Sequence, residues 1–379
     1  MNKRQSWNIV TLFLLLIFGL TAAAVLKPDK SFSENENRAL ASMPKLSLDS
    51  LLSGEFATDY ETYLTDQFIF RDGWIGMKTT AERLTFRQEA NDIYFAADDY
   101  LIEKHTGAFE TEQAQTNITY LAAFMEKMSE TYDSAHLTAM VVPNAVDILR
   151  DKLPPFASPY DEETYLDQIK AALPQGVWFD TSGVLEQHKE EEIYYRTDHH
   201  WKTLAAFYVF ADWIQEKGLG TASLADYQIT AVSDSFRGTV ASKVGIETKP
   251  DTLEIFEPVN PVSYLLTYNQ SDDVRSTVYQ RQVLDSKDQY SIYYGGNYGL
   301  VEASTEAGTG RRLLIIKDSY AHCFTPFTYQ FFDQVDMLDL RYFSQSLSEF
   351  MEQKDYTDIL FLYNASGFAE DTSLARLNT

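Results

Sequence analysis

The stretch Leu313-Leu-Ile-Ile-Lys-Asp-Ser-Tyr320 decides the fold class. Its apolar residues 313–316 predict a buried strand, and Ser319 follows that strand directly before a helical pattern. A serine just past a strand, at the mouth of the next helix, is where α/β folds expose a nucleophile. Its backbone N–H and that of its neighbour Tyr320 could there face a developing oxyanion. We therefore expect an α/β fold with Ser319 at its reactive edge.

A second stretch, Tyr195-Arg-Thr-Asp-His-His-Trp201, supplies the groups that a serine nucleophile needs. A serine alcohol requires a base, and the base requires an acceptor that holds its tautomer. Asp198 and His200 are two residues apart, so the carboxylate can accept from one imidazole nitrogen while the other nitrogen faces Ser319. The intervening His199 would point elsewhere. The pattern predicts a Ser-His-Asp acyl-transfer site in the chain order Asp, His, Ser.

Other interpretations of these residues remain open from spacing alone. Asp198 could cap a helix that starts near Trp201, and Ser319 could cap the helix that follows it. Capping and catalysis can coexist at Ser319, because a helix N-terminus favours negative charge nearby. A metal site would use Asp198, His199, His200 and His322. We expect no metal, because adjacent histidines rarely share one ion and no His-x-x-x-His spacing is present.

Two further polar residues follow predicted strands. Asn364 comes directly after the apolar strand 359–363 and could donate its amide to an oxyanion, although a turn residue is an equal alternative. Arg341 follows the predicted strand 335–340 and could hold an anionic or polyhydroxylated substrate, or could be an ordinary surface arginine. With Tyr320, these residues are the candidates for oxyanion or substrate contacts.

The N-terminus predicts export. Lys3 and Arg4 precede an uncharged run of 18 residues, from Ile9 to Leu26. This length lies between a signal peptide and a spanning helix, and Ala22-Ala-Ala24 could satisfy a cleavage site. We favour an uncleaved anchor because the run exceeds the usual signal core. By the positive-inside rule, the rest of the chain lies outside the cytoplasm in either case.

Composition narrows the function classes. The 379-residue chain carries 31 Lys and Arg against 56 Asp and Glu, a net charge of −25, which would repel nucleic-acid phosphates. We therefore exclude a nucleic-acid partner. Hydrophobic residues make up 45% of the chain, which excludes general disorder. The single cysteine, Cys323, excludes an intrachain disulfide and a cysteine-based zinc cluster.

The pattern along the chain predicts its organisation. Residues 1–26 form the signal anchor or signal peptide, residues 27–90 a polar linker with a helical region from 48 onward, and residues 91–379 the α/β domain. Alternating strands and helices in that domain predict a parallel sheet flanked by helices. Residues 221–308 read instead as a β-rich insertion. Expected elements include helices near 112–130, 161–172 and 202–217, and strands at 136–142, 290–294 and 359–363.

The string Thr197-Asp-His-His-Trp201 resembles the signature of the DHHW protein family. Further similarity lies in Ser33-Glu-Asn-Glu-Asn-Arg38, Tyr63–Phe68 with Arg71, Val142-Pro-Asn144, Asp318-Ser-Tyr320 and Ile359–Asn364. That family is similar to the periplasmic alginate O-acetyltransferases, whose catalytic module resembles SGNH hydrolases. One departure is Lys317-Asp-Ser in place of the Gly-Asp-Ser of SGNH hydrolases. The resemblance implies an SGNH hydrolase-like fold, with Asp198 as the orienting residue, His200 as the base and Ser319 as the nucleophile.

The resemblance also implies a reaction. Ser319 would be acetylated by a membrane-bound O-acyltransferase partner, and the acetyl group would pass to a hydroxyl of an exported polysaccharide or cell-wall glycan. No cofactor is needed, and no Gly-x-Gly-x-x-Gly motif is present to hold a dinucleotide. Two alternatives remain open: an esterase that uses the same three residues with water as acceptor, and a non-catalytic glycan-binding or assembly protein.

Overall fold

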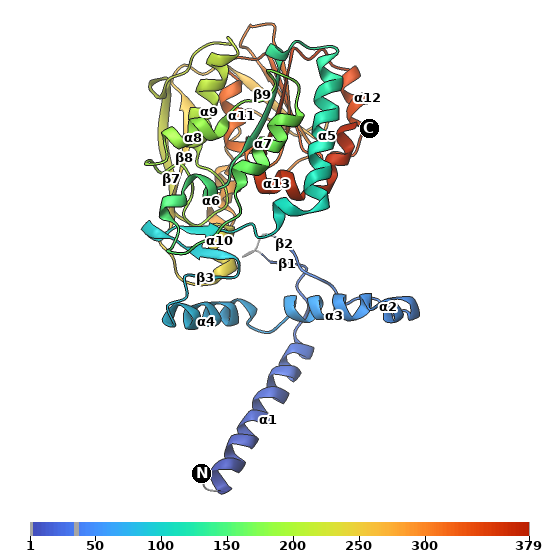
Figure 1. The fold of residues 1–379 in the computed structure, drawn as a ribbon, viewed down its shortest axis with the longest axis vertical. Coiled ribbons are helices and arrows are strands. Elements are labelled where there is room, and N and C mark those ends of the chain that lie inside the picture. Colours follow the sequence, from blue (N-terminus) through green and yellow to red (C-terminus); the bar gives the residue numbers. More distant parts are fainter. Residues whose placement is uncertain (1–2, 34–37, 379) are drawn as a thin grey trace. The chain divides into compact units, whose positions relative to one another are not determined.

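A computed structural model describes residues 3–33 and 38–378 (Figure 1). The chain forms two compact units. The N-terminal unit comprises residues 1–87 and 242–247, and the sheet unit comprises residues 88–241 and 248–379. The division expected near residue 90 from the sequence stays a prediction.

The N-terminal unit begins with a candidate membrane anchor. Helix α1 (Lys3–Leu26) contains a stretch, Arg4–Ala24, that is long and apolar enough to cross a membrane. Strands β1 (Phe32–Ser33) and β2 (Arg38–Ala39) pair antiparallel after it. Residues 34–37 of the segment that resembles the DHHW family lie outside the described residues.

The predicted helical region from 48 to 90 is three helices rather than one: α2 (Leu48–Ser53), α3 (Glu55–Asp66) and α4 (Arg71–Leu84). Gly54, with a φ of 83°, separates the first two, because a left-handed residue ends the regular hydrogen-bond ladder. Phe70 is also left-handed and precedes α4. Strands β3 (Glu89–Ala90), β4 (Ile93–Phe95) and β5 (Leu101–Glu103) then form a three-stranded antiparallel sheet that opens the sheet unit.

A seven-stranded sheet in the order β10-β9-β11-β13-β12-β14-β6 is the centre of the sheet unit. Strands β13, β12, β14 and β6 pair parallel, which places β12 in the middle of the parallel half. The strands are β6 (Leu137–Val142), β9 (Tyr264–Tyr268), β10 (Val274–Arg275), β11 (Leu300–Thr305), β12 (Arg312–Lys317), β13 (Gln334–Leu338) and β14 (Asp358–Asn364).

The predicted parallel sheet is only one half of a mixed sheet. Three strands from the 221–308 region, β9, β10 and β11, extend the parallel half by antiparallel pairing, beginning with β11 against β13. Only β7 (Tyr227–Phe236) and β8 (Asp251–Pro258) form a separate antiparallel pair. Strand patterns reveal that strands exist, but the partner and direction of each strand depend on contacts distant in sequence.

The parallel strands are apolar on both faces because helices cover both faces. Alternate residues of each strand enter two different cores, as Leu313 and Leu314 of β12 illustrate. One core contains α5 (Glu112–Ser129), α7 (Glu162–Ala172), α12 (Leu347–Glu352) and α13 (Ala365–Glu370). The other contains α6 (Ala145–Ile148), α8 (Thr181–Gln187), α9 (Thr203–Glu216) and α11 (Ala321–Thr328). Figure 1 shows α5 and α12 on one side of the sheet and α8, α9 and α11 on the other.

Short elements complete the chain. Helix α10 (Thr239–Val244) belongs partly to each unit. The predicted strand 290–294 is wrong, because residues 290–292 belong to the 3₁₀ helix η7 (Gln289–Ile292). Tyr290 within it and Tyr293 and Tyr294 after it are buried. The other 3₁₀ helices are η1 (Ala97–Asp99), η2 (Ala108–Glu110), η3 (Ser134–His136), η4 (Arg150–Lys152), η5 (Leu224–Asp226), η6 (Arg281–Asp285) and η8 (Thr372–Asn378).

Candidate active site

Ser319 lies in the turn between β12 and α11. Strand β12 is buried from Leu313 to Lys317, and α11 begins at Ala321. The N-cap position of that helix belongs to Tyr320, and no side chain caps it. Ser319 is therefore not an N-cap, and its hydroxyl is available to another partner. The carboxyl edge of a parallel sheet is where α/β folds place their sites, and Ser319 lies at that edge.

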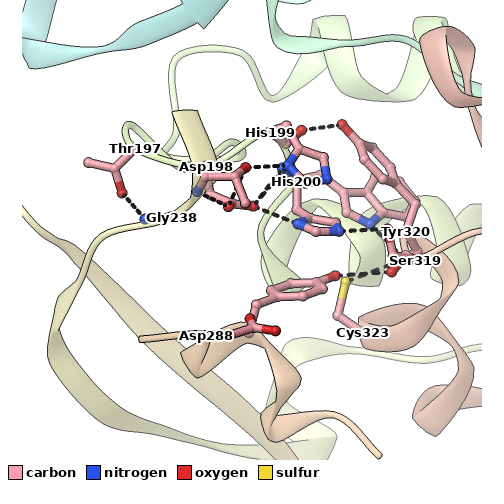
Figure 2. A network of polar contacts seen from close by, with 12 residues as sticks. Thr197, Asp198, His199, His200, Gly238, Asp288, Ser319, Tyr320 and Cys323 are labelled. Carbon is pink, nitrogen blue, oxygen red and sulfur yellow. Dashed lines mark hydrogen bonds and ion pairs between the residues drawn. The ribbon is translucent and has the colours of Figure 1, made fainter. Parts of the chain in front are cut away.

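The hydroxyl of Ser319 is hydrogen-bonded to His200, which in turn is hydrogen-bonded to Asp198 (Figure 2). The distance from Ser319 Oγ to His200 Nε2 is 2.8 Å, and that from His200 Nδ1 to Asp198 Oδ1 is 2.5 Å. Asp198 and His200 are buried, and Ser319 is half-buried. The structure thus brings together the three residues that the sequence singled out, although 119 positions separate His200 from Ser319.

Asp198 is positioned by Thr239 as well as by the histidine. Its Oδ2 accepts hydrogen bonds from Thr239 N at 2.9 Å and Thr239 Oγ1 at 3.2 Å. Gly238 lies so close that a Cβ at this position would overlap the Asp198 side chain. Asp198 does not cap the following helix, because α9 begins only at Thr203. The carboxylate therefore accepts from four donors, two on Thr239 and two on His200, namely its backbone N–H and its ring Nδ1, and is fixed in one orientation.

The charges of the pair follow from these contacts. Burial alone would raise the pKa of Asp198, but the charges of His199 and His200 and the hydrogen bond from His200 hold that pKa well below its usual range. Burial lowers the pKa of His200 to about 4, and Asp198 only partly opposes this. At neutral pH the arrangement is an ionised carboxylate and a neutral imidazole. Its Nδ1–H donates to Asp198, which leaves Nε2 able to accept the serine proton.

Two hydrogen bonds hold the histidine segment to the serine turn. Tyr320 Oη donates to the backbone oxygen of His199 at 2.6 Å, and Trp201 Nε1 donates to the backbone oxygen of Tyr320 at 2.9 Å. Both rings are fully buried and lie 5.5 Å apart in a stacked arrangement. The buried Tyr320 ring therefore fixes the position of the histidine segment relative to the serine turn.

Two aromatic rings contact the imidazole of His200. Tyr290 stacks on it with centroids 3.8 Å apart and an interplanar angle of 14°, and His199 lies 3.9 Å away at a tilt of 36°. Tyr290 Oη also donates to the backbone oxygen of Ser319 at 3.3 Å. The sequence interpretation missed both Tyr290 and Thr239. A strand was expected at Tyr290, and a lone threonine in a turn carries no catalytic pattern.

Asn364 has a different partner from the one expected. Its Nδ2 donates to Asp318 Oδ2 at 2.6 Å, and its backbone N–H donates to the same oxygen at 2.8 Å. The backbone N–H of Tyr320 donates to Asp318 Oδ1 at 2.9 Å. The predicted roles of Asn364 and Tyr320 as oxyanion donors are therefore not supported by this geometry, because both donors are directed to a buried carboxylate. Within the described residues, the backbone N–H of Ser319 has no such acceptor.

Arg341 is also committed to a neighbour. Its guanidinium donates to both oxygens of Asp339, at 2.9 and 2.7 Å. Asp339 accepts a further hydrogen bond from Lys317 Nζ at 3.0 Å, and Lys317 Nζ lies 2.8 Å from His322 Nε2. Burial lowers the pKa of Lys317, while the charge of Asp339 opposes that shift. To bind substrate as predicted, Arg341 would have to leave its ion pair with Asp339, which also holds Lys317 at the end of β12.

Asp198, His199 and His200 present three possible metal-ligand atoms within 4.8 Å of one another. Both nitrogens of His200 already have partners, since Nδ1 faces Asp198 and Nε2 faces Ser319. His199 Nδ1 lies 2.8 Å from Thr239 Oγ1. A shared ion would have to replace one of the His200 hydrogen bonds, so the donor set fits a proton relay better than a metal.

A family model described as "DHHW protein" matches residues 115–338, which is more than half of the chain and includes the Asp198–His200 segment and Ser319. The chain belongs to the DHHW family. A search of the curated proteins finds no match.

Several bacterial proteins of known structure have a similar fold. A DHHW family protein from Eubacterium siraeum DSM 15702 is 24% identical, with a TM-score of 0.62 over 77% of this chain and 96% of that one. Bacillus cereus PatB1, solved with a sulfonyl adduct, is 21% identical, with a TM-score of 0.59 over 74% and 98%. The O-acetyltransferase domain of Pseudomonas putida AlgJ is more distant, at 12% identity and a TM-score of 0.46 over 75% and 98%. The first two likenesses show a shared fold.

Proposed function

We propose that this protein is an extracytoplasmic, serine-dependent O-acetyltransferase that acts on an exported polysaccharide or cell-wall glycan. The observation that carries the proposal is the hydrogen-bonded relay from Asp198 through His200 to Ser319. The chain belongs to the DHHW family, and the resemblance of that family to alginate O-acetyltransferases, inferred from the sequence, supports acyl transfer. The apolar α1, behind Lys3 and Arg4, supports a location of the rest of the chain outside the cytoplasm.

In the first half-reaction, His200 Nε2 takes the proton of Ser319 as Ser319 Oγ bonds to the acetyl carbonyl carbon of the donor. The carbonyl oxygen becomes an oxyanion, for which the backbone N–H of Ser319 is a donor. When the tetrahedral intermediate collapses, the bond to the donor oxygen breaks, and His200 returns its proton to that oxygen. The product is an acetyl-serine ester and a neutral imidazole.

In the second half-reaction, a glycan hydroxyl replaces the donor. His200 takes its proton, the glycan oxygen attacks the acetyl-serine carbonyl, and the Ser319 Oγ–carbon bond breaks. The proton returns to Ser319 Oγ. Atoms and charges balance without a cofactor, and a base positioned in this way contributes about 10²–10⁴-fold to the rate. We further propose a membrane-bound O-acyltransferase as the source of the acetyl group, since α1 would anchor the chain in the same membrane.

The main alternative is an acetylesterase, in which water resolves the same acetyl-serine. The two reactions differ only in the acceptor. Purified full-length protein in detergent, given an acetyl ester with and without an oligosaccharide, separates them. Acetylated oligosaccharide indicates transfer, whereas free acetate that is insensitive to the oligosaccharide indicates hydrolysis.

A nucleophilic Ser319 is tested with a sulfonyl fluoride, a reagent class suggested by the sulfonyl adduct of PatB1. We expect one covalent adduct, at Ser319, by peptide mass spectrometry, and loss of acetyl turnover. Ser319→Ala should abolish both results, and the matched control Ser235→Ala, at an exposed serine of β7, should change neither. An unmodified Ser319, or full acetylation in cells carrying Ser319→Ala, would favour a non-catalytic glycan-binding or assembly role.

A further inference from the structure

Helix α4 of the N-terminal unit has an apolar stripe that faces solvent. Residues at helical spacing share one side of it, because steps of three and four residues return to the same face. The stripe consists of Phe70, Trp74, Met77, Ala81 and Leu84. The four large side chains are 73%, 40%, 62% and 76% exposed in that order. Single exposed apolar residues are common, but a continuous stripe of them along a helix marks an interaction surface.

The opposite side of α4 is covered by the same unit. Gly76 and Thr79 are buried there. Gly76 lies so close to the backbone oxygen of Gly245 that a Cβ would overlap it. This contact fixes the rotation of α4 about its own axis, so the apolar stripe is turned outward by packing. The apolar side of α4 thus faces outward, whereas the apolar side of a surface helix in a water-soluble domain faces the core.

Phe residues at both ends of α4 adopt a left-handed backbone. Phe70, before the helix, has a φ of 56°, and Phe86, after it, has a φ of 61° and is 92% exposed. This conformation is unfavourable for a residue with a Cβ, and asparagine or glycine normally occupies it. Two largely exposed aromatic rings are therefore placed on backbone that costs free energy, which indicates that another partner contacts them.

The start of the stripe is tied to the point where the chain leaves α1. Lys27, the residue after α1, donates from Nζ to the backbone oxygen of Gln67 at 3.4 Å. Gln67 exchanges two further hydrogen bonds with the backbone of Lys30, at 3.0 and 2.8 Å. Phe70 is three positions after Gln67, a reach of about 11 Å at most. If α1 crosses a membrane, Phe70 therefore lies at its outer surface.

A cavity of about 750 Å³ in this unit has the mixed lining of a membrane interface. Charged side chains and aromatic rings line it together, and they include Lys27, Lys30, Asp66, Phe32, Phe68 and Phe70. Segments that lie in the headgroup region combine charged side chains with Phe, Trp or Leu side chains that reach the acyl boundary. The net charge of −25 disfavours attraction to anionic lipids, so the apolar stripe would supply the binding.

We propose that α4 is a second membrane contact, which lies in the outer interface of the bilayer that α1 crosses and buries the stripe among lipid acyl chains. The partner is the lipid surface. The 14 residues of α4 would give a contact about 21 Å long, which restricts the N-terminal unit to the membrane plane. This proposal does not depend on the reaction at Ser319.

The test uses the full chain in vesicles of phosphatidylethanolamine and phosphatidylglycerol. Cys323 is buried, and burial raises the pKa of its thiol to about 12, so an introduced cysteine is labelled selectively. A fluorophore is attached in separate proteins at Met77→Cys or Leu84→Cys on the stripe, and at Arg83→Cys as the matched control. Arg83 is also exposed but lies on another side of α4. Leu15→Cys, within α1, verifies insertion.

The fluorophores are quenched by iodide in water or by a brominated lipid. We expect labels at positions 77 and 84 to be at least about fivefold less sensitive to iodide than the label at 83, and to be quenched by the brominated lipid as position 15 is. Equal iodide quenching at 83 and 84 would overturn the proposal. Shielding of 77 and 84 from both quenchers would also overturn it, since a protein partner would then cover the stripe. Failure of position 15 to reach lipid would overturn it as well.

Discussion

Asp198 and Asp318 are both buried carboxylates within a short distance of Ser319, yet their surroundings differ. Asp198 faces two imidazoles, and its pKa is held well below the usual range despite burial. Asp318 accepts, among the described residues, from N–H groups of Asn364 and Tyr320, and burial raises its pKa to about 6. Burial alone therefore does not determine the role of a carboxylate. Asp198 can stabilise a histidine cation that forms during reaction, whereas Asp318 holds backbone in place.

Each aspartate also has a glycine packed against it. Gly238 leaves no room for a Cβ beside Asp198. A Cβ on Gly367 would lie 2.9 Å from Asp318 Oδ2 and 2.5 Å from the Asn364 amide. The surroundings of Asp198 and Asp318 are thus similar, because each carboxylate lies between its hydrogen-bond donors and the backbone of a nearby glycine. They differ in what the carboxylate contacts. Asp198 contacts the base His200, whereas Asp318 contacts N–H groups that hold the backbone in place.

The largest effect is expected from Asp198→Asn. The amide cannot hold His200 in the tautomer that accepts the serine proton, so kcat should fall by about 10³–10⁴-fold while the fold is retained. Asp318→Asn is the matched variant and should cost less than about tenfold in kcat. Acetyl-ester turnover and circular dichroism of both variants measure this. Similar losses of kcat in the two would mean that the aspartates do not have separate roles.

Gly238→Ala should have the next largest effect. The new methyl group must displace the Asp198 carboxylate, and a shift of about 1 Å in a catalytic group can cost about 10²-fold in rate. Gly367→Ala should instead lower the free energy of unfolding by about 1–3 kcal/mol, because it strains the Asn364–Asp318 hydrogen bonds. Turnover and urea denaturation separate the two effects. A Gly238→Ala protein of normal activity would contradict the close packing described here.

The pH dependence should also distinguish the two carboxylates. His200 accepts a proton only when neutral, and its pKa is lowered to about 4, so kcat/KM should stay high down to about pH 5 and fall below that. Protonation of Asp318 near pH 6 should add only a shallow step, because its N–H donors then lose part of their acceptor. That step should vanish in Asp318→Asn. A full loss of kcat/KM near pH 6.5 would instead indicate an ordinary histidine.

The smallest effect is expected from Tyr290→Phe. The ring still stacks on His200, while the lost hydroxyl removes a hydrogen bond to the Ser319 backbone oxygen at 3.3 Å and a contact with the Cys323 thiol. Such a bond contributes about 0.5–1.5 kcal/mol, so kcat should fall by no more than about tenfold. Tyr290→Leu also removes the ring that stacks on His200, so the kcat of this variant should fall further. Equal kcat values for the two variants would show that the stacking is unimportant for turnover.

Local sequence patterns predicted the parts of this protein that depend on local physics. The helix expected near 112–130 is Glu112–Ser129, and the apolar run 313–316 lies in the central strand. Asp198, His200 and Ser319 could be selected because their residue types and their places beside regular elements suit acyl transfer. The sequence could not place Tyr290, whose contact with His200 joins segments 90 residues apart through a turn that resembles a strand. Nor could it reveal that Asn364 faces Asp318, since an amide after a strand suits either role.

The rings on either side of His200 have a consequence for the order of events. Tyr290 and His199 lie 3.8 and 3.9 Å from the centre of the imidazole, and Asp198 holds its far nitrogen. The imidazole therefore cannot swing between two proton-transfer positions, and a single location must serve both substrates. In the proposed transfer reaction, the donor would therefore have to depart before a glycan hydroxyl reaches Nε2, which predicts parallel double-reciprocal plots for a ping-pong enzyme.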